Sequence, residues 1–269
     1  MKLSVPIRKA DWWFKPNFWL HGILVLAINC LMMFGIGDFL LANGEMSPHH
    51  TNGHAQNHSM VMGQWEGSPE GIAYSEFNHA LAGIGVILVG LTELRAAMGW
   101  QVWAWSRWVL PASLIGSGVF LLIWSDHEAW PIGSWTLAET FSGRDPEMLQ
   151  HKLFGLLALG VGLVEWCLRV ERFQHVFWRA LLPGFALIGG LMLFSHMHGP
   201  HPAGHQIQVH HNVMGTLALA GGLAWFAGEL MKPSHPVHTY DSLHRSGLKV
   251  LWAVLVISIG IQLLFYSEA

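Results

Sequence analysis

The chain has 269 residues, of which 52% are hydrophobic and only 12% are charged, and its net charge at pH 7 is −3. Soluble domains carry about 25% charged residues, so this composition excludes an ordinary soluble protein and predicts a membrane protein. The two cysteines, Cys30 and Cys167, both lie within apolar runs, which argues against a disulfide framework. We expect membrane lipid around the chain and no nucleic acid partner.

Seven apolar runs come close to the roughly 20 residues that a helix needs to cross a bilayer. They predict an all-α, polytopic membrane helical bundle that forms a single integral membrane domain over residues 1–269. The first run is longer than the apolar core of a signal peptide, so we expect it to be retained. The predicted helices cover residues 18–41, 77–98, 106–124, 151–170, 179–196, 210–230 and 248–266.

Lysine and arginine set the predicted orientation, because they accumulate in short cytoplasmic loops. Twelve of the 14 cations precede the first run or surround the turns after the second, fourth and sixth runs. Only Arg144 and Lys152 fall on the other side. This alternation predicts seven transmembrane helices with the N-terminus inside and the C-terminus outside.

On this topology, 13 of the 18 histidines fall outside or at the outer ends of helices. The first outer loop, residues 43–76, contains "GEMSPHHTNGHAQNHSMVMGQW". Histidine and methionine in a Gly/Ser/Asn-rich stretch are typical of a flexible metal-collecting tract. A second dense stretch, "FSHMHGPHPAGHQIQVHHN", joins the fifth predicted helix to the sixth.

Three predicted helices begin alike, with "NHALAGIGVILVGLTE", "QHKLFGLLALGVGLVE" and "HHNVMGTLALAGGLAW". Each has a histidine followed by glycine four and eleven residues later, and the first two add a glutamate three residues further on. We interpret the pattern as a duplicated helical hairpin, 77–128 and 150–198, with a third partial copy from 210. The repeated positions are His79, Gly83, Gly90 and Glu93; His151, Gly155, Gly162 and Glu165; and His211, Gly215, Gly222 and Trp225.

These repeated residues share one face of each helix, because their offsets return to nearly the same direction at 100° per residue. Small residues on one face let membrane helices approach closely, so the glycines predict a packing seam. An ionisable residue in a membrane helix faces the bundle interior by default and marks a candidate functional site. His79, His151 and His211 are therefore the candidate cofactor ligands.

The two repeated glutamates, Glu93 and Glu165, lie near the predicted inner interface. One interpretation is that they pair with Arg95 and Arg169 or reach water. The other is that they form a cytoplasmic exit or proton site.

Copper is the metal that the donor types favour. Imidazole suits several transition metals and thioether suits reduced copper, so mixed histidine and methionine without cysteine favour copper over zinc. The two histidines of the "HMH" triplet, His196 and His198, can bind the same ion only if the helix ends there. The Gly-Pro that follows predicts such an end. Another histidine lies between Asp126 and Glu128, carboxylates that can bind metal or orient the ring. The candidate metal ligands are His79, His127, His151, His196, His198, His210 and His211.

A b-type haem is the alternative cofactor, because His79 with His151, or either with His211, would supply two axial imidazoles from facing helices. The one-sided placement of histidine allows a single haem in an electron-transfer subunit, not a conduit across the bilayer. A third hypothesis is an accessory subunit of a larger membrane complex, with histidines that bind zinc or are incidental. No nucleophile–base pair, phosphate-binding loop or dinucleotide fingerprint stands out, so we assign no catalytic residue.

The histidine-led helices, the "WSDH" and "FSHMH" helix ends and the His/Met-rich outer loop together resemble the copper-resistance D family of bacterial inner-membrane proteins. That family in turn looks distantly related to the four-helix membrane b-type cytochromes. The resemblance covers about residues 77–230 and implies a multi-pass protein that handles periplasmic copper in uptake, storage or delivery. The family often has a soluble copper-binding partner domain, which this sequence does not contain. We therefore expect a separate partner, either a periplasmic copper protein or a membrane cuproenzyme complex. The residues that carry it are His79, His127, His151, His196, His198 and His211.

Overall fold

The computed structural model describes residues 68–100, 103–173, 175–195, 204–230 and 239–268. The predicted helix 18–41, most of the loop 43–76, and the candidate ligands His196 and His198 lie outside these residues. Within the described ranges the chain is helical and has no strand. The helices are α3 (Pro69–Ala97), η2 (Ser106–Trp108), α4 (Val109–Ile123), α5 (Leu137–Thr140), α6 (Pro146–Arg169), α7 (Val176–Ser195), α8 (Gly204–Leu230) and α9 (Thr239–Leu264).

Five helical segments in the described part of the chain are long and apolar enough to cross a membrane. They are Pro69–Ala97, Ser106–Ile123, Pro146–Arg169, Phe177–Ser195 and Ser246–Leu264. This finding confirms the prediction of an all-α chain and supports that of a membrane protein, whereas the seven transmembrane helices and their orientation stay a prediction.

Helices α3 and α6 begin eight and five residues before the apolar runs that predicted them. Ser68 caps α3 by accepting a hydrogen bond from the Gly71 N–H (3.1 Å), and Asp145 caps α6 by accepting one from the Met148 N–H (3.0 Å). Proline follows each cap, where its fixed φ suits the first helical turn. These starts are polar and therefore invisible to hydropathy, and they place the repeated histidines inside the helices.

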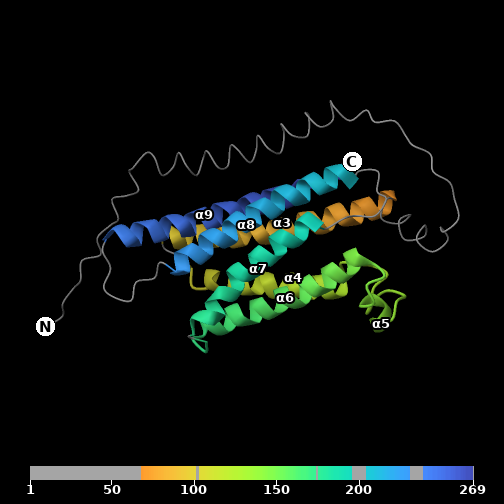
Figure 1. Ribbon diagram of the computed structural model, residues 1–269, viewed down its shortest axis with the longest axis horizontal. Coiled ribbons are helices and arrows are strands. Elements are labelled where there is room, and N and C mark those ends of the chain that lie inside the picture. The colour runs from red at the N-terminus through yellow and green to blue at the C-terminus, as the bar shows by residue number, and fades with distance from the viewer. Residues whose placement is uncertain (1–67, 101–102, 174, 196–203, 231–238, 269) are drawn as a thin grey trace, which may run out of the picture. The chain divides into compact units, whose positions relative to one another are not determined.

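The six long helices contact one another in a ring, in the order α3, α9, α8, α7, α6, α4 and back to α3. The most extensive contacts join α3 with α9, α4 with α6, and α7 with α8. Figure 1 shows α4 lying along α6, and α9 lying along α3. The described helices thus form three tightly packed pairs. The pair of α3 and α9 is the one whose two helices are far apart in sequence.

In each of the three pairs the helices cross where a glycine of one helix meets a glycine of the other. A Cβ atom on Gly83 would lie 2.8 Å from the Gly260 carbonyl oxygen, and one on Gly190 would lie 2.8 Å from that of Gly215. Contacts this short leave no room for a side chain. The packing seam predicted from the repeated glycines is confirmed, and its glycine pairs are Gly83 with Gly260, Gly118 with Gly155, and Gly190 with Gly215.

We predict that Gly118→Ala destabilises the protein, because the new Cβ would lie 2.6 Å from the Leu159 backbone nitrogen of α6. Overpacking of this kind costs about 1–3 kcal/mol, so the melting temperature in detergent should fall by several degrees. Gly116→Ala is the matched control on the same helix, because its Cβ would meet no atom within 4 Å. Equal melting temperatures for the two variants would contradict the seam.

Candidate functional site

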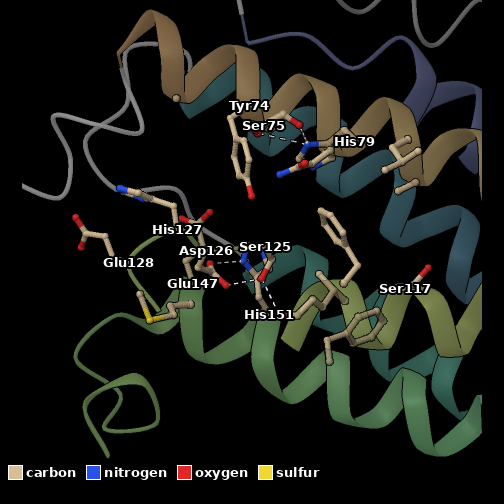
Figure 2. Close-up of a pocket in the computed structure, with 18 of the residues that line it drawn as sticks. Tyr74, Ser75, His79, Ser117, Ser125, Asp126, His127, Glu128, Glu147 and His151 are labelled. Carbon is tan, nitrogen blue, oxygen red and sulfur yellow. Dashed lines mark hydrogen bonds and ion pairs between the residues drawn. The ribbon is translucent and has the colours of Figure 1, made fainter. Parts of the chain in front are cut away.

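A cavity of about 600 Å³ lies between α3, α4 and α6, bounded also by the loop after α4 and by the C-terminal segment. We call it the acidic cavity, because five carboxylates line it and none of its lining residues is lysine or arginine. His79 and His151 lie on opposite sides of it, on α3 and α6 (Figure 2). Its charged and metal-binding side chains are Asp126, Glu128, Asp145, Glu147 and Glu268, together with His79, His127, His151 and Met148.

The ring of His151 is held by Asp126. The Nδ1–H donates to Asp126 Oδ1 at 2.8 Å, since the carboxylate can only accept. Burial opposes ionisation of Asp126, but the hydrogen bond and charge of His151 and the charge of Lys152 outweigh it and lower the pKa of the carboxyl to about 2. Asp126 is therefore ionised at neutral pH, and in the neutral form of His151 the lone pair lies on Nε2.

Lys152 completes this group from the next position on α6. Its side chain is only 1% exposed, and Nζ lies 3.0 Å from Asp126 Oδ2. The ammonium also donates to the Leu121 carbonyl oxygen (3.0 Å) and to Ser125 Oγ (3.3 Å). One half-buried carboxylate thus neutralises Lys152 and fixes His151.

His79 is held by its own helix and by the C-terminal segment. Its Nδ1–H donates to the Ser75 carbonyl oxygen at 2.8 Å, which again leaves the lone pair on Nε2. Its ring stacks on Tyr266 with a centroid distance of 3.9 Å. The Ser75 hydroxyl donates to Glu268 Oε1 at 2.5 Å, and the Tyr266 hydroxyl donates to the same oxygen at 3.1 Å. The C-terminal segment therefore positions His79 from two directions.

Glu268 and Tyr266 were not predicted as site residues, although the sequence holds a signal for them. Asp126 follows Gly118 by eight residues in "GVFLLIWSD", and Glu268 follows Gly260 by eight in "GIQLLFYSE". Both glycines occupy helix crossings, and both acids lie beside a repeated histidine or its supporting serine. The segment after α9 therefore supports the repeated histidine of α3 through Glu268, as the segment after α4 supports the repeated histidine of α6 through Asp126.

A second, apolar chamber of about 370 Å³ adjoins the acidic cavity and shares His79 and His151 with it. His211 also lines this chamber, is 2% exposed, and has its ring centroid 6.5 Å from that of His79. His210 lies beside Tyr266, with ring centroids 5.6 Å apart. The three repeated histidines therefore border one chamber, although they come from α3, α6 and α8.

The other predicted ligands are more dispersed. His127 is exposed in the loop after α4 and lines only the acidic cavity. Among the described residues, no three side chains of the His, Cys, Asp and Glu types are grouped closely enough to hold a metal ion. The five predicted ligands within the described residues, His79, His127, His151, His210 and His211, therefore do not form such a group.

The repeated glutamates share one arginine. Arg169 Nη2 lies 3.5 Å from Glu93 Oε1, and Arg169 Nη1 pairs with Glu165 one helical turn earlier. Arg95 lies over the rings of Trp100 and Trp103, at 5.9 and 5.1 Å. The ion-pair interpretation holds for Arg169, which joins α3 to α6 at the end of the bundle opposite the histidines.

We predict that Asp126→Ala is strongly destabilising, because it leaves the buried Lys152 ammonium without a counter-charge. Removing one partner of a buried ion pair costs about 3–5 kcal/mol. The double variant Asp126→Ala/Lys152→Met should recover most of the loss of melting temperature in detergent. If the double variant melts no higher than the single one, the ion pair is not the cause.

Comparisons with known proteins give no relative from which function can be transferred. No protein family model, no curated protein and no solved structure matches the chain. Its function is therefore inferred from the chemistry of the acidic cavity and the apolar chamber.

Proposed function

We propose that this protein binds copper on the outer face of a bacterial inner membrane, in copper uptake, storage or delivery. The observation that carries the proposal is the lining of the acidic cavity, which combines five carboxylates, imidazoles and a thioether without lysine or arginine. A cleft lined by one sign of charge concentrates counter-ions, so this cavity attracts cations. Imidazole and thioether then select copper, particularly in its reduced state.

The two central imidazoles have the support that metal ligands need. Metal-binding histidines usually donate the second ring N–H to a carboxylate or a backbone carbonyl, which fixes the tautomer. His151 donates to Asp126, and His79 donates to the Ser75 carbonyl. Met148 is buried one helical turn before His151 and lines the same cavity. We assign His79 and His151 as the principal ligands and Met148 as an additional donor.

The proposed topology of the whole chain places the opening of the acidic cavity on the outer side of the membrane. With seven transmembrane helices and the N-terminus inside, the acidic cavity opens to the periplasm, on the side of the loop 43–76. That loop would capture the ion and pass it to His79 and His151, with the remaining predicted histidines as further ligands. The resemblance to the copper-resistance D family supports this role and a periplasmic copper protein or membrane cuproenzyme as partner.

Haem b is the second candidate, because His79 and His151 also border the apolar chamber. A single haem between them would make the protein an electron-transfer subunit. Haem carries two anionic propionates, and these would meet the carboxylates of the adjoining acidic cavity. Like charges at close range are unfavourable, so copper ranks first.

Copper binding is tested by titrating the purified, metal-free protein with Cu(I) against a chromophoric Cu(I) chelator. We predict that His79→Ala/His151→Ala weakens Cu(I) binding by more than about 100-fold, the upper end of the effect of changing an outer-shell partner. His175→Ala is the control, because His175 is exposed and lines neither cavity. Elemental analysis distinguishes copper from zinc.

Two outcomes would contradict this assignment. Unchanged Cu(I) affinity in the double variant would move the site to other histidines. An absorption spectrum with a Soret band that shifts on reduction, and that is lost in the double variant, would establish haem in place of copper.

A further inference from the structure

The acidic cavity is larger and longer than a metal ion requires. Its volume of about 600 Å³ lies within the range of about 300–1,000 Å³ that is typical of sites for drug-sized molecules. Along α3 its lining runs from Gly71 to Gly85, which is about 21 Å at 1.5 Å per residue. An ion bound to His79 and His151 would occupy a small part of this space. The cavity therefore has room for an organic molecule.

The charged groups of the cavity lie at one end of it. The five carboxylates come from the segment after α4, the start of α6 and the C-terminal segment. Lys152 neutralises Asp126 from below, and none of the described residues that line the cavity is lysine or arginine. A cleft lined by one sign of charge concentrates counter-ions, so a positively charged group is favoured at this end. The remaining four carboxylates are those of Glu128, Asp145, Glu147 and Glu268.

The other end of the cavity is apolar, apart from two serine hydroxyls of α4. On α6 the lining passes from Glu147 to Phe154, seven residues or about 10 Å further into the bundle. Apolar groups of a ligand gain free energy when such a surface removes them from water. One ligand can therefore use both ends only if it is charged at one end and apolar at the other. The apolar lining residues are Leu81 and Ala82 on α3, Phe120 and Leu121 on α4, and Phe154 on α6.

Aromatic side chains line the cavity on three helices. Figure 2 shows Tyr74 extending from α3 toward the segment after α4, where its hydroxyl donates to the Trp124 carbonyl oxygen. Phe120 on α4 and Phe154 on α6 also line the cavity. The face of an aromatic ring attracts a cation, including the ammonium group of a ligand. An organic cation therefore gains contacts here that a hydrated metal ion does not.

We propose that the acidic cavity binds an amphipathic organic cation. Its charged group lies among the carboxylates, and its apolar part lies against the lining further into the bundle. The apolar chamber continues that lining, because Gly85, Leu121 and Phe154 border both spaces. The carboxylates repel an anion of the same shape, and an uncharged apolar molecule gains nothing from them. The proposal goes beyond copper binding, because the apolar and aromatic lining takes no part in the proposed metal site.

The proposal is tested by equilibrium dialysis of the metal-free protein in a non-ionic detergent against tetraphenylphosphonium, with empty micelles as the blank. Wild type should bind one cation per chain in a saturable manner. Tetraphenylborate, an anion of nearly the same size and shape, is the matched probe and should show no saturable binding. Saturable binding of the two probes with equal affinity would show that charge does not select the ligand, and would overturn the proposal.

Variants test the two ends of the cavity separately. Glu128→Gln/Glu147→Gln should weaken tetraphenylphosphonium binding by about 10-fold or more, because it removes two attractive charges. Glu70→Gln is its control, because Glu70 is exposed near the same end of the bundle and lines neither cavity.

Gly116→Leu should abolish binding by filling the apolar end, where a Cβ would meet no atom within 4 Å. Gly160→Leu should retain binding, because Gly160 is equally open but lines neither cavity. Melting temperatures show whether each variant folds, and the charge variant is an independent test if Gly116→Leu does not. Equal binding by wild type, the charge variant and Gly116→Leu would overturn the proposal, as would the absence of saturable binding in wild type. No copper is present in this experiment, so its result is separate from that of the Cu(I) titration.

Discussion

The close approach of helix backbones at three glycine crossings is the constraint on which this structure depends. Apolar side chains gain little by leaving lipid for the interior of a bundle, so membrane helices associate largely through packing. Glycine from either helix allows that packing between α3 and α9, α4 and α6, and α7 and α8. Between pairs the contacts are less extensive, and both cavities lie there.

Much of this arrangement could be predicted from the sequence because the repeat marks it. The histidine and glycine spacing gave the inward face of three helices, and apolar runs located the described helices to within a few turns. Pairing of α3 with α9 could not be predicted, because it joins distant segments and no local pattern specifies it. The helix starts were missed because Ser68 and Asp145 act as caps outside the apolar runs.

The candidate site was predicted in part. The repeat identified His79 and His151, but not the residues that hold them, because Asp126, Lys152 and Glu268 reach these helices from other elements. The sequence pattern treats Lys152 only as a cation that marks orientation. Its burial could not be predicted, because it depends on the Asp126 carboxylate from another element. His127 and His210 are adjacent to site residues in sequence, yet each lines or contacts a different part of the site. Whether two histidines can bind the same ion therefore depends on the helix face that each occupies, more than on how close they are in sequence.

Arg169 joins two helix pairs at one end of the bundle only. It binds glutamates on α3 and α6, two helices that belong to different tightly packed pairs, at the end far from the histidines. The Arg169 ion pairs therefore hold α3 and α6 together at that end, whereas at the other end the two helices face each other across the acidic cavity.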